Sequence, residues 1–119
     1  MTTIDRKGNI THTKGDTFAL TLFDVKLDDV LIIFAGWKAK LVVRTTPDAV
    51  TEILALTETA GIDLSTKGQV AIMADAAAIM KDIPARNYYV YDLEITDDEG
   101  NVDTWFSNKR FTITEEVAW

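Results

Sequence analysis

Apolar and polar residues alternate with a period of two along most of this chain. Phe18, Leu20 and Leu22 fall on one face of an alternating segment, with small or polar residues between them. Residues 37–44 and 88–96 repeat the pattern, each with an apolar face that includes aromatic residues. Because successive side chains of a strand point to opposite faces, the alternation predicts strands with one buried face.

The last part of the chain predicts several consecutive strands. A strand over residues 88–96 leads into the turn sequence DDEGN, in which Gly100 can take positive φ. Two further strand-like segments follow, 102–106 and 109–114. We therefore expect a β-meander in this region.

The middle of the chain is less regular. Residues 48–56 suit either a short helix or a strand, whereas residues 68–73 predict a short strand. One short helix is expected at about 75–83, because Asp75 is a good N-cap, three alanines follow, and Pro84 ends the segment.

Together these elements predict an all-β, Ig-like antiparallel β-sandwich with one short helix. A closed barrel has the same pattern and stays open at this point. An antibody-type domain is excluded, since it needs a Cys–Trp–Cys framework and the chain has no cysteine. We expect a single domain over residues 1–119, with 1–13 as an extended N-terminal arm.

The amino-acid composition limits which metal sites and which partners the protein can have. The 119 residues, 47% of them hydrophobic, are enough for a buried core without disulfides. With no cysteine and one histidine, thiolate metal sites, iron–sulfur clusters and histidine clusters are excluded. The net charge of −7 repels phosphate, so we expect neither nucleic acid nor a membrane among the partners.

The sequence predicts no targeting or membrane segment. The first 18 residues are polar and lack the apolar stretch of a signal peptide. The longest apolar run, residues 30–36, is far shorter than the roughly 20 residues that a membrane span needs.

No constellation of residues predicts catalysis. His12 would need a nucleophile and an orienting carboxylate, and the only serines, Ser65 and Ser107, do not lie in nucleophile-elbow sequences. We therefore expect His12 at the surface or at a strand edge. We expect no enzyme activity, no catalytic residues and no cofactor.

Two acidic clusters raise the possibility of calcium binding. In the cluster Asp97, Asp98, Glu99 and Asp103, the carboxylates are mostly consecutive, and Gly100 stands at the wrong offset for a calcium loop. A hydrated hairpin tip explains this cluster. Asp24, Asp28 and Asp29 are interpreted in the same way, as an inter-strand turn.

The apolar run VLIIFAGW exceeds what one alternating face needs. Such a run is either a strand buried on both faces or a loop that another subunit covers. Trp105 is out of phase with Phe106, so one of the two is expected at the surface. The residues that we expect to contact other proteins are Val30, Ile32, Phe34, Trp105, Val117 and Trp119. Stacking of a glycan on Trp105 or Trp119 is an alternative.

The order of short motifs along the chain carries a family resemblance. The motifs are KGDTF at 14–18, GWKA at 36–39, VR at 43–44, a glycine-led strand at 68–73, IP at 83–84, YVYDLEI at 89–95, DEG at 98–100, FTI at 111–113 and EV at 116–117. This succession resembles small β-sandwich domains of tailed-bacteriophage virion proteins, above all the N-terminal domain of baseplate upper proteins and similar tail-fibre domains. Two segments depart from the pattern: ARN at 85–87 replaces a usual glycine, and 23–35 lacks a glycine turn.

The resemblance implies a non-enzymatic structural protein of the virion, made in the host cytoplasm. It would be a baseplate, tail-tip or fibre-attachment component that contacts other virion proteins and forms homo-oligomers within the assembly. Head-surface decoration or a head fibre is one alternative, and a carbohydrate-binding module that contacts host glycans is another. The resemblance carries no catalytic or cofactor-binding residues.

Overall fold

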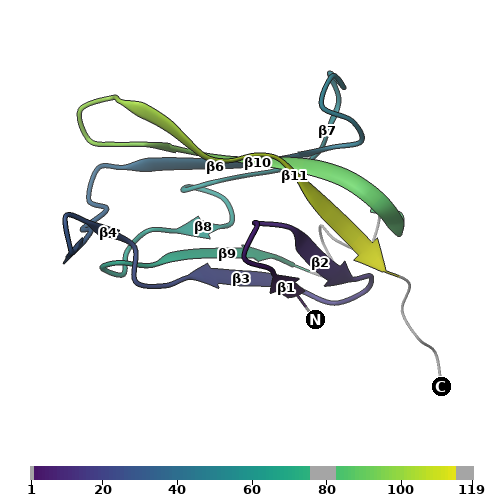
Figure 1. Ribbon diagram of the computed structural model, residues 1–119, viewed down its shortest axis with the longest axis horizontal. Helices are drawn as coiled ribbons and strands as arrows, with labels where there is room; N and C mark the ends of the chain where they lie inside the picture. Colours follow the sequence, from purple (N-terminus) through teal and green to yellow (C-terminus); the bar gives the residue numbers. More distant parts are fainter. Residues whose placement is uncertain (1, 76–82, 115–119) are drawn as a thin grey trace.

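A computed structural model describes residues 2–75 and 83–114, apart from the side chains of 86–88. Two β-sheets lie face to face, and a small hairpin lies at one end of them (Figure 1). The strands are β1 (Thr2–Ile4), β2 (Ile10–Thr13), β3 (Phe18–Leu22), β4 (Lys26–Leu27), β5 (Val30–Leu31), β6 (Lys38–Arg44), β7 (Glu52–Thr57), β8 (Ile62–Asp63), β9 (Val70–Ala74), β10 (Arg86–Thr96) and β11 (Val102–Thr114).

The strand order is that of an Ig-like sandwich. One sheet has the order β1-β2-β11-β10-β6-β7, and the other has the order β3-β9-β8. All neighbouring strands are antiparallel except β2 and β11, which are parallel. The predicted all-β sandwich is confirmed. The two sheets are separate and have open edges, so the alternative of a closed barrel does not apply. The helix expected at 75–83 falls almost entirely on residues 76–82, which lie outside the described residues.

Residues 2–13 form a hairpin rather than an extended arm. Ile4 of β1 pairs with Ile10 of β2, and β2 continues the six-stranded sheet beside β11. The expectation of an arm was wrong because the polar sequence of this segment conceals two buried positions, Ile10 and His12. These alternate along β2 and point into the core.

The expected meander is instead a long hairpin, in which β11 is one continuous strand. Asp92 of β10 lies opposite two residues of β11, Ser107 and Asn108, so the ladder contains a bulge at this point. The sequence SN interrupts the alternation without ending the strand, because a bulge accommodates the extra residue. Asn108 takes a φ of 50°, which asparagine tolerates.

The ambiguous segment in the middle of the chain is a strand, β7. Leu54 and Leu56 are buried while Ala55 between them is exposed, which is strand periodicity. The strand predicted at 68–73 is β9, displaced by one or two residues to Val70–Ala74.

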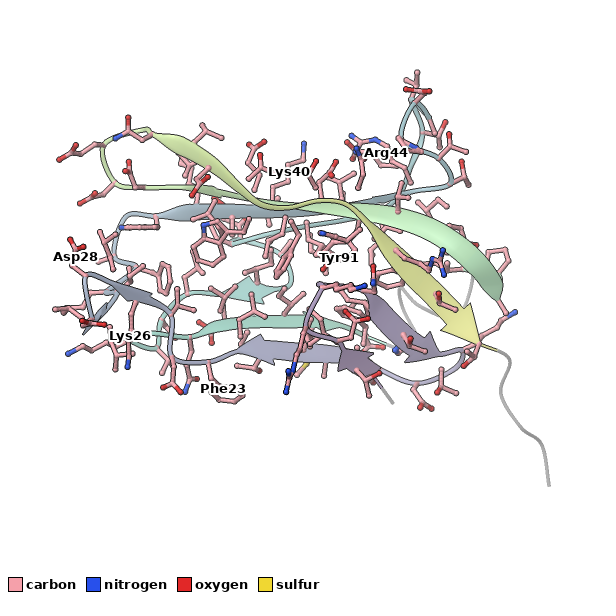
Figure 2. The ribbon with its side chains drawn as sticks, viewed as in Figure 1. Phe23, Lys26, Asp28, Lys40, Arg44 and Tyr91 are labelled. Carbon is pink, nitrogen blue, oxygen red and sulfur yellow. The ribbon has the colours of Figure 1, made fainter. Side chains whose placement is uncertain are left out.

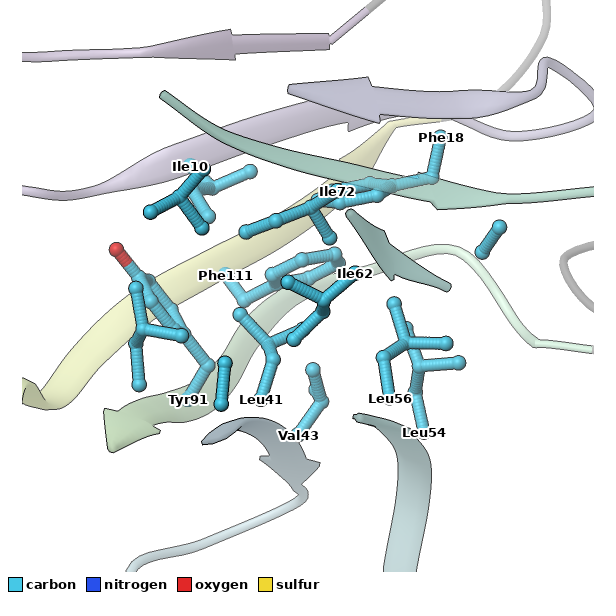
Figure 3. Packing of buried hydrophobic residues seen from close by; sticks show 14 of the residues in the cluster. Ile10, Phe18, Leu41, Val43, Leu54, Leu56, Ile62, Ile72, Tyr91 and Phe111 are labelled. Carbon is cyan, nitrogen blue, oxygen red and sulfur yellow. The ribbon is translucent and has the colours of Figure 1, made fainter. Parts of the chain in front are cut away.

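The core lies between the two sheets, as the alternating faces predict (Figure 3). From β6, Ala39, Leu41 and Val43 all point inward. A row of ring contacts crosses the core with centroid separations of 5.5 to 6.2 Å, and its members are His12, Phe18, Phe111, Tyr91 and Phe106. Aromatic packing therefore links the sheets in a chain that has no cysteine.

Tyr89, near the start of β10, forms a tyrosine corner. Its hydroxyl donates a hydrogen bond of 2.8 Å to the carbonyl oxygen of Pro84, five residues upstream. Ig-like sandwiches have such a corner at the beginning of the corresponding strand, two residues before the core position that holds a cysteine in antibody domains. Here that core position is occupied by Tyr91.

In the described part of the chain, no helix is long and apolar enough to cross a membrane.

Candidate functional site

The β4–β5 hairpin projects from one end of the sandwich (Figure 1). Leu27 pairs with Val30, so Asp28 and Asp29 form a two-residue turn between them. Both aspartates take positive φ, at 52° and 64°, as a type I′ hairpin turn requires. The expectation that Asp28 and Asp29 form an inter-strand turn is confirmed, and Asp24 also takes positive φ.

A single glycine anchors this hairpin to the sandwich. The N–H of Val25 donates to the Gly68 carbonyl oxygen (2.9 Å), and the N–H of Gly68 donates to the Ile32 carbonyl oxygen (2.7 Å). Gly68 has a φ of 70°, and a Cβ at this position would lie 2.6 Å from Leu31 Cδ2. The close approach of the hairpin to the loop before β9 therefore depends on a residue without a side chain.

A groove of about 550 Å³ lies between this hairpin and the neighbouring end of the β10–β11 hairpin. Its walls are mainly apolar, and its polar residues include both signs of charge. The apolar lining is Leu22, Val25, Leu27, Ile32, Trp37, Ile95, Trp105 and Phe106, and the polar lining is Lys26, Asp97, Asn101 and Asp103.

Phe34 packs against two of the aromatic residues of the groove from the core side. Its ring meets Trp37 edge-on at 5.1 Å and lies 6.4 Å from the ring of Trp105. Phe34 itself is only 3% exposed. The two tryptophans are therefore fixed in place by packing, which makes the groove a preformed surface.

A second bulge brings Trp105 into the groove. Leu93 pairs with Phe106 and Glu94 pairs with Thr104, so Trp105 is an additional residue in β11. An additional residue breaks the strict alternation of a strand. Trp105 and Phe106 are consequently both half-buried and both line the groove, which corrects the expectation that one of them is exposed.

Exposed apolar side chains gather on the segment that carries the hairpin. Phe23, Leu27, Val30 and Ile33 are each between 63% and 66% exposed, and they are four of the seven large apolar residues exposed in the described part of the chain. Figure 2 shows Phe23 on the outer side of the three-stranded sheet, with Lys26 and Asp28 on the hairpin beside it. We call these four residues together with the groove the apolar end.

The tip of the β10–β11 hairpin is a closed polar turn. Asp97 Oδ1 accepts hydrogen bonds from the N–H groups of Glu99 (3.0 Å) and Asn101 (2.8 Å), and Oδ2 accepts one from Asn101 Nδ2 (3.1 Å). The bond from the Asn101 N–H is the main cause that lowers the pKa of the Asp97 carboxyl. The expected hairpin tip is thus confirmed. Among the described residues, no cluster of three or more His, Asp or Glu side chains could hold a metal ion.

The β1–β2 hairpin has the same turn, which the sequence reading missed. Asp5 Oδ1 accepts from the N–H groups of Lys7 and Asn9, both at 2.9 Å, and Gly8 takes a φ of 88°. The motif D-x-x-G-N, which occurs at 5–9 and again at 97–101, would have predicted both hairpins.

The residues expected to contact partners fall into different environments. Val30 is exposed at the apolar end, and Ile32 and Trp105 are half-buried in the groove. Phe34 belongs to the core, so its side chain is not available to a partner in this conformation. Val117 and Trp119 lie outside the described residues. Sequence reasoning missed Phe23 and Leu27 as members of this surface, whereas Ile33 and Trp37 lie in the run VLIIFAGW that it singled out.

His12 is fully buried, which corrects the expectation of a surface or strand-edge position. Its Nε2 lies 3.0 Å from the Asp16 carbonyl oxygen, and its Nδ1 lies 2.8 Å from Thr2 Oγ1. A carbonyl accepts only, so Nε2 donates and, in the neutral ring, Nδ1 accepts from the Thr2 hydroxyl. Burial lowers the pKa of the His12 imidazole. The ring is a structural link between β1, β2 and the loop before β3.

The fold and this surface define an all-β protein of the Ig-like sandwich class with a preformed apolar end. A comparison of the sequence with models of protein families finds no match. A search of curated proteins also finds no match.

Proposed function

We propose that this protein is a structural component that acts by binding other proteins through its apolar end. The observation that carries the proposal is that four exposed apolar residues, Phe23, Leu27, Val30 and Ile33, lie on one short segment, which also contributes Leu27 to a groove with aromatic walls. Contiguous apolar surface on a small protein marks an interaction site, because leaving it in water is unfavourable.

The apolar end has the rigidity that a binding surface needs. The hydrogen bonds of Gly68 fix the hairpin, and Phe34 fixes Trp37 and Trp105. Residues already held in place lose little conformational entropy when a partner binds, so more of the contact energy contributes to affinity. Tryptophan side chains in such positions are frequent hot spots of protein interfaces.

We further propose that the assembly is the virion of a tailed bacteriophage, with the protein at the baseplate, tail tip or fibre attachment. The support is the resemblance of the order of sequence motifs to that of virion β-sandwich domains, together with the sandwich fold itself. The partners would be other virion proteins, with homo-oligomers formed within the assembly. Head-surface decoration or a head fibre differs from this only in location.

Quantitative mass spectrometry of purified particles tests the virion role. We expect the protein at a fixed ratio to the major capsid protein, with a few to a few tens of copies at the tail and hundreds on the head. Absence from the particles would overturn the proposal. If the protein is present in the particles, a photo-cross-linking amino acid at position 27 should yield an adduct with a virion protein. The same amino acid at the exposed position 50, which lies outside the apolar end, should yield none.

A carbohydrate-binding function is the second candidate. Trp37 and Trp105 line the groove beside the polar residues Asp97, Asn101 and Asp103, and sugar sites combine such residues. Titration with host cell-wall polysaccharide should then change the intrinsic tryptophan fluorescence, and a Trp105→Ala variant should lose the change. An unchanged spectrum at millimolar sugar would exclude this candidate.

A further inference from the structure

We propose that the apolar end recognises a basic protein segment, in which a large apolar side chain is flanked by lysine or arginine. This inference rests on the proposed function, because it names the chemistry of the partner that the same surface would bind. The apolar side chain would occupy the groove, and the flanking cations would face the acidic residues around it.

Acidic residues predominate in the segments that form the groove. Asp97 and Asp103 line it. The hairpin segment also carries Asp24, Asp28 and Asp29, and the tip of the β10–β11 hairpin carries Asp98 and Glu99. The lysines at this end are Lys26, Lys38 and Lys67. The apolar end therefore carries a net negative charge within a protein whose total is −7, and a cationic partner is electrostatically favoured.

The same distribution disfavours a second copy of this chain as the occupant. Two apolar ends that met would bring both sets of carboxylates together, and like charges placed opposite one another cost free energy. An anionic membrane surface is disfavoured for the same reason. Asp97 is held by its own turn, but Asp98 and Glu99 are exposed at the hairpin tip and Asp103 lines the groove, so these side chains are placed to meet cations.

The groove is large enough to take an inserted apolar side chain. Its volume of about 550 Å³ lies in the range of about 300–1,000 Å³ typical of pockets that enclose a drug-sized ligand, so it has room for a large side chain and part of its neighbours. Among the lining residues, Ile95 is buried and Trp37 is half-buried, whereas the polar residues Lys26, Asn101 and Asp103 are exposed. A partner segment with one large apolar side chain between charged residues would match these apolar and polar parts of the groove.

Selection from a randomised peptide library on the immobilised full-length protein tests the inference. We expect enriched peptides with Trp, Phe, Leu or Ile flanked by Lys or Arg. These peptides should lose binding to a Leu27→Asp variant and keep binding to a Val50→Asp variant. Both side chains are largely exposed, so both variants should fold, and thermal denaturation monitored by circular dichroism checks this.

A charge variant tests the electrostatic part separately. The combined variant Asp98→Asn, Glu99→Gln and Asp103→Asn keeps the apolar groove and should weaken the selected peptides by about tenfold at low salt, with a smaller salt dependence than the wild type. Unchanged affinity would overturn the inference.

The possible outcomes separate this inference from the proposed function. Enrichment of neutral or acidic peptides that still need Leu27 would overturn the basic partner but support protein binding at the apolar end. Failure to enrich any peptide that needs Leu27, or self-association abolished by Leu27→Asp, would overturn the inference. The cross-linking of virion proteins at position 27 would then decide the proposed function independently.

Discussion

The Asp92 carboxylate of β10 accepts a hydrogen bond of 2.7 Å from the backbone N–H of Asn108 in β11. It also pairs with Arg44 of β6, at 3.4 Å between Oδ2 and Nη1. One side chain thus satisfies the backbone at the bulge and links three neighbouring strands across the outer face of the six-stranded sheet. The bulge is stabilised by a residue on the opposite strand, and no residue of the bulge itself supplies the acceptor.

Replacing Asp92 should separate these two roles. Asp92→Ala removes the acceptor for the Asn108 N–H and the partner of Arg44, and should lower the free energy of unfolding by about 1–2 kcal/mol. Asp92→Asn keeps an oxygen acceptor and loses only the half-exposed ion pair, so its cost should be below about 1 kcal/mol. Urea denaturation of both variants measures the difference, and equal losses would show that the bulge bond contributes little.

Two glycines in equivalent turns should respond differently to alanine. Gly8 and Gly100 have almost the same φ, 88° and 87°. A Cβ at Gly100 meets nothing within 4 Å, whereas one at Gly8 would lie 2.6 Å from Phe106 Cδ1. Gly100→Ala should cost about 1 kcal/mol from backbone strain alone, and Gly8→Ala should cost clearly more because the Phe106 ring must move.

The comparison between these two variants uses the same chemical denaturation. Gly8→Ala should in addition alter the near-ultraviolet circular dichroism, since Phe106 packs against the Tyr91 ring. Similar stability losses in the two variants would contradict the predicted clash.

The stability of the fold should depend on pH through His12. Burial lowers its pKa from the ordinary value of 6.5, so below about pH 7 the unfolded chain binds more protons than the native chain. Stability should therefore fall as the pH decreases through 6.5 towards the lowered pKa, by up to about 1.4 kcal/mol per pH unit. Equilibrium denaturation at a series of pH values measures this slope.

His12→Gln is the control for the pH dependence. Glutamine can still donate a hydrogen bond, but it does not titrate, so the slope between about pH 5 and 7 should flatten. The chain has no other histidine. An unchanged slope in the variant would assign the pH dependence to other groups.

Gly68→Ala should release the β4–β5 hairpin while leaving the core folded. The added Cβ would collide with Leu31, and the hydrogen bonds between Gly68 and the hairpin should break. Hydrogen exchange should show faster exchange of the backbone amides of Val25 and of residue 68 and unchanged exchange in the centre of β6. Faster exchange throughout the protein would instead indicate general destabilisation.

The strand pattern could be predicted from the sequence because each buried face repeats every second residue. The alternation over residues 37–44 therefore predicts the inward-facing residues of β6, which are Ala39, Leu41 and Val43. The bulges of β11 at Ser107–Asn108 and at Trp105 could not be predicted in this way, since a break in the alternation does not show whether the strand ends or continues past an additional residue. Strand β2 was missed for a different reason. Its buried histidine, His12, forms hydrogen bonds with Thr2 and with the Asp16 carbonyl oxygen, and the alternation of apolar residues does not indicate such partners.

The apolar end was only partly predictable. The excess of apolar residues at 30–37 correctly indicated that one alternating face could not account for them. Within that run, however, no periodicity shows that Phe34 turns inward and Ile33 outward. The direction in which these two side chains point depends on the type I′ turn at Asp28 and Asp29 and on the hydrogen bonds of Gly68. Gly68 lies more than thirty residues further along the chain.

The position of β11 between β2 and β10 determines the order in which the molecule can assemble during synthesis. The β1–β2 hairpin is made before β11, but its place in the six-stranded sheet exists only when β11 has left the ribosome. The β1–β2 hairpin can therefore join its sheet only after all the strands between β2 and β11 have been made. Completion of the sheet is for this reason later than the formation of the hairpin, and it joins two segments that lie far apart in the sequence.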